Sequence, residues 1–461
     1  MTTVVIIGGG PGGYEAALVA AQLGADVTVV ERDGVGGSAV LTDCVPSKTL
    51  IATSDLMTDV EGAAELGVLL AGADQTGVQV DLSRVNGRVK KLALAQSADI
   101  GGRLRRDGVE IVSGTARLAS RGSVVVTDED RGESRLDADV VLLATGARPR
   151  ILDSARPDGD RILTWEQVYD LNELPERLIV VGSGVTGAEF AGAYLGLGSD
   201  VVLVSSRDRV LPGEDADAAL VLEGVLTRRG MSVLSRSRMS SVGRRGDGVV
   251  VTLTDGRMVE GSHCLLAVGS VPDTADLGLA DAGVVLGDGG FIRVDGVSRT
   301  TAPGVYAAGD CTGVLMLASV AAMQGRIAMW HALGDAVRPL DLREVSSNVF
   351  TEPEIATVGW TQAKVDSGEV AADSVMLDLS GNPRAKMQGV HDGFVKLFCR
   401  AGTGIVVGGV VVGPRASELI HPVSIAVACH LTADQVAHAF TVYPSMSGSV
   451  AEAARRLHVR G

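Results

Sequence analysis

Apolar residues at the start of the chain form a continuous run rather than an alternating one. Residues 4–7 read VVII, the pattern of a short strand that is buried on both faces. A glycine-rich turn, GGGPGG, follows, and then the helical stretch YEAALVAAQLG. The next apolar run, DVTVVER, contains Glu31 near its end. This order predicts a strand, a turn, a helix and a second strand within residues 4–31.

The same order returns in the middle of the chain, where RLIVV precedes GSGVTG, a helical stretch and the strand pattern DVVLV. Long helical patterns occupy residues 52–110. Beyond about residue 346, Gly/Val-rich strands alternate with helical segments such as ADQVAHAF and SVAEAARRL. Strands that alternate with helices are typical of sheets covered by helices. We therefore expect an α/β protein with two Rossmann-like units.

Both glycine turns have the spacing of a dinucleotide-binding turn. Gly8 permits the tight turn, Gly10 the close approach of a pyrophosphate, and Gly13 the close packing of the helix. The phosphates would bind at the helix N-terminus, and Glu31 is placed to accept hydrogen bonds from a ribose. The second unit repeats the spacing with Gly182, Gly184 and Gly187. Two dinucleotide sites predict two cofactors with electron transfer between them.

The second unit differs from the first at the end of its second strand. Where the first unit has Glu31, the second has Ser205, Ser206 and Arg207, with Arg209 close behind. Without an acid at this point, a 2′-phosphate meets no repulsion, and an arginine can pair with it. These residues therefore favour NADPH over NADH, although NADH is also an expected substrate.

Composition narrows the kind of protein. A chain of 461 residues is too long for one hydrophobic core, so several domains are expected. The net charge of −15 argues against a nucleic-acid or acidic-lipid partner. Five dispersed cysteines form neither a metal-binding pattern nor a disulfide framework, which indicates a reducing cytoplasm and no metal. No signal peptide or membrane-spanning run is expected.

Further motifs resemble the flavoprotein disulfide reductases, the family of lipoamide dehydrogenase, glutathione reductase and mercuric reductase. They are LLATGARPR at 142–150, LLAVGSVPDT at 265–274, TTAPGVYAAGDC at 300–311, VFTEPEIATVG at 349–359 and GVVVGPRASELI at 409–420. The resemblance covers nearly the whole chain. It implies FAD on the first unit, NAD(P)H on the second, and a C-terminal α+β dimerisation domain that forms a homodimer.

The resemblance also implies domain boundaries and site residues. The expected domains are an FAD-binding domain (1–150 and 277–345), an NAD(P)H-binding domain (151–276) and an interface domain (346–461). Lys48 and Glu189 match a pair beside the flavin ring, and Asp310 matches an aspartate that contacts the ribityl chain. The motifs add Thr145, Gly146 and Gly269 to the expected cofactor-binding residues.

The sequence departs from this family at its disulfide site. Members that reduce disulfides carry two cysteines in a C-x4-C arrangement, but here Ala39 stands in the first position and only Cys44 remains. The partner subunit supplies an HPTxxE segment in the family, with His as the base and Glu to orient it. Here Tyr443 replaces the His and Gly448 replaces the Glu. The chain therefore lacks the thiol, the base and the orienting acid together.

This combined loss predicts removal of one half-reaction. NADPH should still reduce FAD, and reduced flavin would pass its electrons directly to a small acceptor, for which a quinone is the natural class. The chain is in this respect most similar to the quinone-reducing members of the family. Cys44 near a helix N-terminus, which favours the thiolate, and Tyr443 are candidate catalytic residues. An inherited structural cysteine and a tyrosine that merely fills the space left by His are the alternatives.

Two other functions stay open at this point. One is a different dithiol-free flavin oxidoreductase, such as a pyridine-nucleotide transhydrogenase or a diaphorase. The other is a non-catalytic relic that senses NADPH, although the retained Lys48, Glu189 and Asp310 argue against it. A lipoamide dehydrogenase is excluded, because a C-x4-C disulfide cannot form with Ala39.

Overall fold

The computed structural model describes residues 1–68, 78–128 and 132–458. The chain forms two compact units. Unit 1 comprises Met1–Ser47, Asn86–Arg150 and Val268–Asp341, and unit 2 comprises Lys48–Val85, Ile151–Ala267 and Leu342–Gly461. The expected helical stretch at 52–110 contains residues 69–77, which lie outside the described part of the chain. The three domain boundaries drawn from the sequence stay a prediction.

Unit 1 is built on a five-stranded parallel sheet. Its order is β18 (Val305–Ala307), β7 (Val140–Leu143), β1 (Thr3–Ile7), β2 (Asp26–Glu31) and β3 (Glu110–Ser113). Side chains of β1 alternate between two cores: Val4 and Ile6 pack with the helices, and Val5 and Ile7 pack with a second, three-stranded sheet. That sheet contains β4 (Thr115–Ser120), β5 (Ser123–Asp128) and β6 (Gly132–Asp137). Burial on both faces explains the continuous apolar run.

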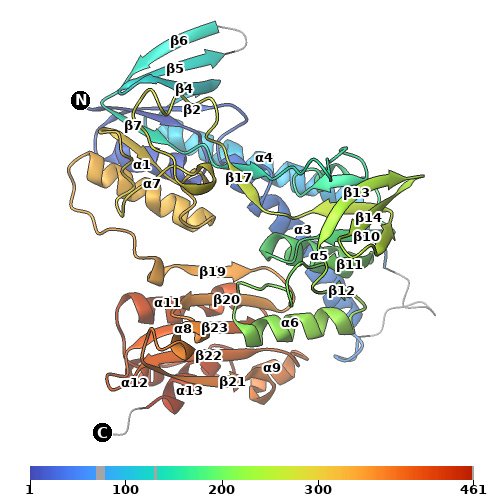
Figure 1. The fold of residues 1–461 in the computed structure, drawn as a ribbon. Coiled ribbons are helices and arrows are strands. Elements are labelled where there is room, and N and C mark those ends of the chain that lie inside the picture. The colour runs from blue at the N-terminus through green and yellow to red at the C-terminus, as the bar shows by residue number, and fades with distance from the viewer. Residues whose placement is uncertain (69–77, 129–131, 459–461) are drawn as a thin grey trace. The chain divides into compact units, whose positions relative to one another are not determined.

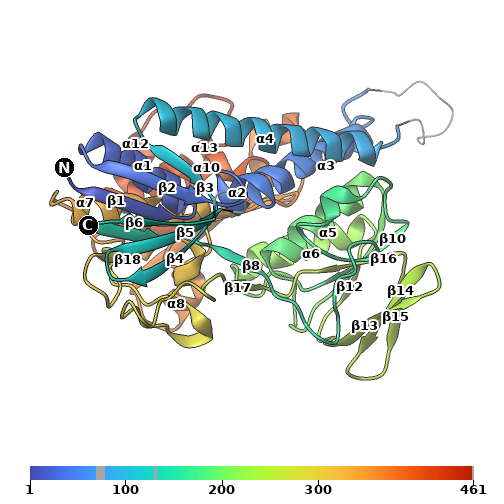
Figure 2. The ribbon, with the colours of Figure 1, turned by 90° about the horizontal axis from the view of Figure 1, so that it is seen from above.

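Two helices, α1 (Pro11–Gln22) and α7 (Ala318–Ala332), lie side by side on this sheet, as Figures 1 and 2 show. Their backbones meet where Gly325 faces Gly12. A Cβ atom on Gly325 would overlap with the carbonyl oxygen of Gly12. The two helices therefore pack at a distance that only glycine allows.

Four further elements lie within the first 150 residues. They are α2 (Gly37–Leu41), α3 (Cys44–Gly62), α4 (Leu82–Arg106) and the short strand β8 (Ala147–Pro149), which pairs with β17 (Ser270–Pro272). Within the described residues, no helix is both long and apolar enough to cross a bilayer.

Unit 2 contains a second parallel sheet with the same plan. Its order is β12 (Ser232–Leu234), β11 (Asp200–Val204), β10 (Arg177–Val181), β16 (His263–Leu266) and β9 (Ile162–Thr164). Helix α5 (Val185–Leu197) packs on β10 and β11, and α6 (Ala216–Arg228) follows. An antiparallel ribbon of β13 (Met239–Arg245), β14 (Gly248–Leu253) and β15 (Met258–Gly261) adjoins this sheet (Figure 2). The two parallel sheets confirm the predicted α/β fold.

The C-terminal part of unit 2 is an antiparallel sheet. Its order is β19 (Ser346–Val349), β20 (Glu354–Gly359), β23 (Val406–Gly413), β22 (Phe394–Arg400) and β21 (Ala372–Asp378). The helices around it are α8 (Gln362–Asp366), α9 (Pro383–Met387), α10 (Ala416–Leu419), α11 (His421–Ala428), α12 (Ala433–His438) and α13 (Gly448–Arg456) (Figure 1). Strand β23 is buried throughout, since α11 and α13 complete one core with the sheet. The expected α+β region is thus confirmed.

The contact between α1 and α7 gives a first prediction. Gly325→Ala should lower the free energy of unfolding by about 2 kcal/mol, because the added methyl group overpacks a backbone contact. Gly87→Ala is the matched control: Gly87 lies exposed inside α4 with open space around it. That change should raise stability by about 0.5–1 kcal/mol through helix propensity. Chemical denaturation of both variants measures the difference, and equal effects would contradict this account of the packing.

Candidate active site

The first glycine turn joins β1 to α1 in unit 1. Gly8 has φ 101°, and a Cβ there would overlap with the carbonyl oxygen of Ala144. A Cβ on Gly13 would overlap with the carbonyl oxygen of Gly8, so the helix packs directly on the turn. At Gly10 the nearest atom to a Cβ is 4.0 Å away, on Gly37. The turn is therefore closed by backbone on its inner side and open at Gly10, which fits the pyrophosphate of FAD.

Glu31 lies at this turn, as the sequence predicts for the acid of a dinucleotide unit. Its Oε2 accepts a hydrogen bond from the backbone N–H of Gly9 at 2.6 Å, and its Oε1 accepts one from Asp33 at 2.8 Å. These two bonds fix the carboxylate at the end of β2. A carboxylate offers about four acceptor positions, so it has capacity for the hydroxyl groups of a ribose.

Three other expected cofactor-binding residues lie in the same unit. Gly146, with φ 74°, and Gly269, with φ 93°, both have open space around them. Thr145 donates its hydroxyl to the carbonyl oxygen of Asp273 at 2.6 Å. These positions leave room for a ligand to approach the backbone at both glycines.

Asp310 begins a short 3-10 helix, η3 (Asp310–Thr312). Burial, followed by the negative charge of Asp43, raises the pKa of its carboxyl to about 6. Hydroxyl groups that donate to the carboxylate would offset this burial, which fits the ribityl chain of FAD. The turn before Asp310 is fixed by Gln324, a buried side chain of α7 whose Oε1 accepts the N–H of Gly309 at 2.9 Å. Gln324 is not among the residues expected from the sequence, although an amide among the apolar residues of that helix was a signal.

The second glycine turn joins β10 to α5 in unit 2 and repeats the geometry of the first. A Cβ on Gly182 would overlap with the carbonyl oxygen of Ala267, and one on Gly187 with that of Gly182. Gly184 has no atom within 4 Å of its Cβ position. This turn is therefore also closed by backbone at Gly182 and Gly187 and open at Gly184, and it fits the pyrophosphate of a nicotinamide dinucleotide.

The structure separates the three residues expected to bind a 2′-phosphate. Ser205 is fully buried, and its hydroxyl meets that of Ser183 in the glycine turn at 2.7 Å and accepts the N–H of Arg207 at 3.1 Å. Ser206 and Arg207 are exposed. Ser205 therefore holds the loop to the glycine turn, while Ser206 and Arg207 face solvent.

Lys48 and Glu189 form an ion pair in unit 2. The Nζ of Lys48, from α3, lies 2.8 Å from the Oε2 of Glu189, from α5. Glu189 is only 4% exposed. Its Oε1 accepts the backbone N–H of Phe350 at 2.9 Å, and the ring of Phe350 lies 4.8 Å from the Lys48 Nζ. Each oxygen of the buried carboxylate thus has a donor, and an aromatic face covers the ammonium group. The sequence did not indicate the part played by Phe350.

The cysteines give no disulfide. Cys44 is the first residue of α3 and is half-buried, so the expectation that it lies at a helix N-terminus is confirmed. Ala39 lies in α2. Burial raises the pKa of the Cys311 thiol to about 11, so it stays protonated at neutral pH. None of the five cysteines, all of them among the described residues, is in a disulfide.

Tyr443 is exposed in the chain described here. Its side chain is 83% exposed, and Val442 and Phe440 are exposed beside it. The three lie between α12 and α13. A row of large apolar side chains in solvent is typical of an interaction surface.

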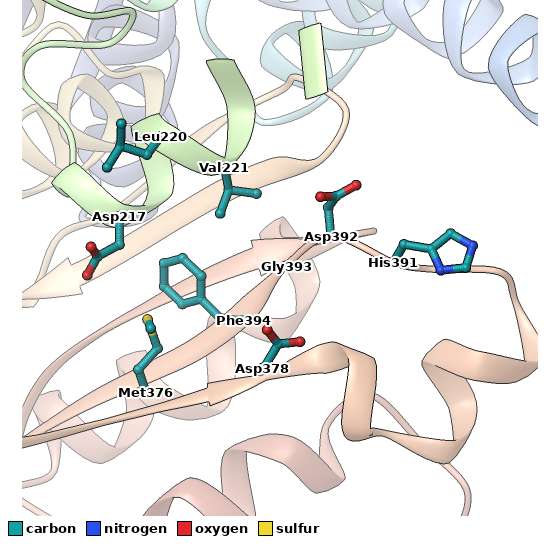
Figure 3. A pocket seen from close by; sticks show the side chains of 9 residues that line it. All are labelled: Asp217, Leu220, Val221, Met376, Asp378, His391, Asp392, Gly393 and Phe394. Atoms are coloured by element: carbon teal, nitrogen blue, oxygen red, sulfur yellow. The ribbon is translucent and has the colours of Figure 1, made fainter. Parts of the chain in front are cut away.

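A cavity of about 310 Å³ lies between α6 and the strands β21 and β22 (Figure 3). Leu220 and Val221 face Met376 and Phe394 across it. None of its lining residues is an expected site residue. Three of its charged groups are in ion pairs: Asp217 with Lys396, Asp392 with Arg228, and His391 with Glu65. The fourth, Asp378, accepts the backbone N–H of Ser380 at 2.7 Å and forms no ion pair within the described residues.

Two carboxyl groups meet near the ion pair. Asp55 lies seven residues beyond Lys48 on α3, and it forms a hydrogen bond with Glu352. Burial, followed by the charge of Glu352, raises the pKa of Asp55 to about 7, and burial also raises the pKa of Glu352. Two carboxyl groups this close share a proton at neutral pH.

Comparison with protein families gives two matches. Residues 2–325 match the model described as pyridine nucleotide-disulphide oxidoreductase. Residues 345–454 match the model of the dimerisation domain of the pyridine nucleotide-disulphide oxidoreductases.

Several known proteins are similar over their whole length. The NAD(P)H dehydrogenase (quinone) of Mycobacterium tuberculosis is 56% identical, with 99% of this chain and 94% of the relative covered. The dihydrolipoyl dehydrogenase of Chlorobaculum tepidum is 34% identical, with 98% and 96% covered. The crystal structure of LpdA from Mycobacterium tuberculosis has a TM-score of 0.95 at 55% identity and covers 100% of both chains. The HOCl-induced flavoprotein disulfide reductase RclA from Escherichia coli, at 24% identity and TM-score 0.86 with 98% and 99% covered, shares the fold.

The carboxyl pair predicts a pH dependence of stability. Because the pKa of Asp55 is raised in the folded protein, its contribution is fully present below its ordinary value of 3.8 and is lost as the pH rises through about 7. Asp55→Asn keeps a hydrogen bond to Glu352 without needing the proton. We expect it to raise the melting temperature at pH 8 by about 2–6 °C, and to raise it less at pH 5.

The control for this prediction is Asp281→Asn, which removes the same charge at an exposed position. Its effect on the melting temperature should be small at both pH values. A gain for Asp55→Asn that is the same at pH 5 and pH 8 would contradict the shared proton.

Proposed function

This chain belongs to the pyridine nucleotide-disulphide oxidoreductase family, and on that basis we propose that it passes electrons from NADPH through FAD directly to a quinone. The membership confirms the resemblance drawn from the sequence motifs and makes the chain an oxidoreductase of a family that uses FAD and NAD(P)H. The acceptor, the preference for NADPH and the residue roles below are parts of the proposal.

One contrast carries the proposal: the reductive side of the site is complete, and the disulfide side is missing. Both glycine turns and the Lys48–Glu189 pair are present. Ala39 stands where a disulfide reductase has its first cysteine, and Tyr443 where it has its histidine. A chain that keeps the means to receive electrons but lacks a dithiol to release them needs an acceptor that reacts with the flavin itself. The name of the 56% identical relative, NAD(P)H dehydrogenase (quinone), supports a quinone in this place.

The glycine turn of unit 1, Glu31 and Asp310 would hold FAD, which when bound would supply the redox chemistry between NADPH and the quinone. The chain's own residues bind and orient the reactants. The open glycine turns hold the two pyrophosphates at the N-termini of α1 and α5. Glu189 fixes the Lys48 ammonium group, so a positive charge is held in one place beside the flavin that the resemblance puts there. Such a fixed charge stabilises negative charge as it develops during transfer.

We assign nucleotide preference to the loop after β11. Ser206 and Arg207 are exposed there, and no acid ends the strand as Glu31 ends β2. Ser205 supports the loop from below. This arrangement favours a 2′-phosphate over a free hydroxyl.

The acceptor site is proposed to form between two copies of the chain. The dimerisation-domain match and the exposed row of Phe440, Val442 and Tyr443 support a homodimer in which a second copy covers this row. Tyr443 of one copy and Cys44 of the other would then border the quinone, either as reacting groups or as walls. The exposed apolar side chains beside Tyr443 support a small apolar acceptor, and five cysteines that form no disulfide support a cytoplasmic location.

The first test compares two oxidants. The flavoprotein is reduced anaerobically with NADPH and then mixed with menadione or with lipoamide, while flavin absorbance reports reoxidation. We expect fast return of oxidised flavin with menadione and none above the background with lipoamide. Fast reoxidation by lipoamide would overturn the proposal. Fast transfer to NAD⁺ with slow transfer to menadione would favour a transhydrogenase, and failure of NADPH to reduce the flavin would favour a non-catalytic sensor.

The second test addresses the ion pair. Lys48→Met should slow flavin reduction by NADPH roughly 10- to 100-fold, because a fixed positive charge is lost, while FAD stays bound. Lys48→Arg should recover part of the rate. Lys386→Met, at an exposed position on α9, is the matched control and should leave the rate unchanged. Stopped-flow absorbance measures all three, and an unchanged rate in Lys48→Met would remove Lys48 from the proposed machinery.

A further inference from the structure

Two neighbouring strands of unit 2 end at the same edge of the parallel sheet, and the segments that follow them are joined along their backbones. β11 and β12 are parallel, with Val204 opposite Leu234. Beyond them, the N–H of Ser237 donates to the carbonyl oxygen of Ser205 at 2.7 Å. The N–H of Arg236 donates to the carbonyl oxygen of Arg207, also at 2.7 Å. The exposed Arg207 thus has a second arginine fixed beside it by the main chain.

Arg236 is held in an unusual conformation. Its φ is 52°, in the left-handed region that few non-glycine residues adopt. Its side chain is exposed and has no core to pack against. Backbone strain of this kind persists where surrounding bonds impose it, and it clusters at functional sites. Here the backbone N–H groups of Arg236 and Ser237 are both bonded to the loop after β11, so two main-chain bonds hold the segment.

The charge of the two segments points to an anion. Residues 205–212 contain two arginines and one aspartate, and residues 235–238 contain two arginines and no acid. In the described part of this acidic chain, neither Arg207 nor Arg236 forms an ion pair with a carboxylate. Other exposed arginines of the same unit do, such as Arg228 with Asp392 and Arg257 with Asp255. Two exposed arginines that are bonded through their main chains, with no carboxylate partner among the described residues, suit a doubly charged phosphate.

The two remaining arginines of these segments, Arg209 and Arg238, are less suitably placed to bind a phosphate. Arg209 is half-buried, and its Nη2 lies 3.4 Å from the carbonyl oxygen of Pro212. Arg238 accepts the N–H of Thr254 on its carbonyl oxygen and so belongs with the antiparallel ribbon. Arg236 is the one bonded directly to the backbone of the loop that ends β11.

We propose that Arg236, from the segment after β12, is a specificity-determining residue that binds the 2′-phosphate of NADPH together with Arg207. The inference rests on the proposed function, in which this edge of the sheet binds the adenosine half of NADPH. It adds a second segment to the residues that bind the phosphate. This segment lies about 30 residues beyond the end of β11, the position at which ribose- and phosphate-binding residues are usually expected.

The test uses the flavin-loaded protein and two probes that differ only by the phosphate in question: adenosine 2′,5′-bisphosphate and 5′-AMP. Calorimetry gives the dissociation constant of each. Arg236→Asn is the main variant, because asparagine tolerates a positive φ, and Arg236→Lys tests rescue by charge alone. Arg245→Asn, an exposed arginine of the ribbon that pairs with Glu260, is the control.

We expect Arg236→Asn to weaken binding of the bisphosphate roughly 10- to 50-fold and to change that of 5′-AMP less than twofold. Arg236→Lys should recover part of the loss, and the control should match the wild type. If Arg236→Asn weakens binding of both probes equally, or of neither, the proposed role of Arg236 is overturned. The NADPH assignment would still stand in that case, provided that the wild type binds the bisphosphate more tightly than 5′-AMP. A wild type that binds both probes alike would instead overturn the NADPH preference itself, and Arg236 with it. Transfer to menadione is measured separately and does not depend on either result.

Discussion

The buried carboxylate of Glu189 is the group around which unit 2 is arranged. A carboxylate that is 4% exposed is costly unless each oxygen has a donor. The donors come from two distant parts of the chain: the ammonium group of Lys48 on α3 and the N–H of Phe350 after β19. Three segments separated by more than a hundred residues are therefore fixed relative to one another by one ion pair and one hydrogen bond. Removing Lys48 would leave a buried charge with half its partners, so the pair has a structural role that does not depend on a dithiol.

Much of this arrangement could be predicted from the sequence, because it depends on local patterns. The run VVII and the two glycine turns predicted the parallel sheets. A strand that is buried on both faces requires consecutive apolar residues, and a turn with no room for a Cβ atom requires glycine. No local sequence pattern indicates the pairing of Lys48 with Glu189, and only the family resemblance suggested it. It is an interaction across 141 residues.

The sequence was least informative where backbone bonds decide a residue's role. Ser205 reads as a phosphate ligand by its position after a strand, yet it is buried because its hydroxyl meets Ser183. Arg236 follows a strand too short to attract attention, and only the pairing of β11 with β12 brings it beside Arg207. Phe350 contributes an N–H, which every residue but proline has, so no side-chain pattern could indicate it. These are non-local main-chain contacts, and residue types do not encode them.

The two ends of the proposed NADPH site are mechanically linked through α5. Gly187, where the helix packs on the turn, is two residues from Glu189, which fixes Lys48. The turn before the helix is bonded through Ser183 to Ser205 and from there to Arg207. A phosphate group bound at the loop after β11, as proposed, would thus be connected to the ammonium group by one short helix and three hydrogen bonds. Loss of the disulfide machinery leaves this connection untouched, because Ala39 and Tyr443 lie on elements that take no part in it. The chain can therefore have exchanged one electron acceptor for another without rebuilding the part that receives the electrons.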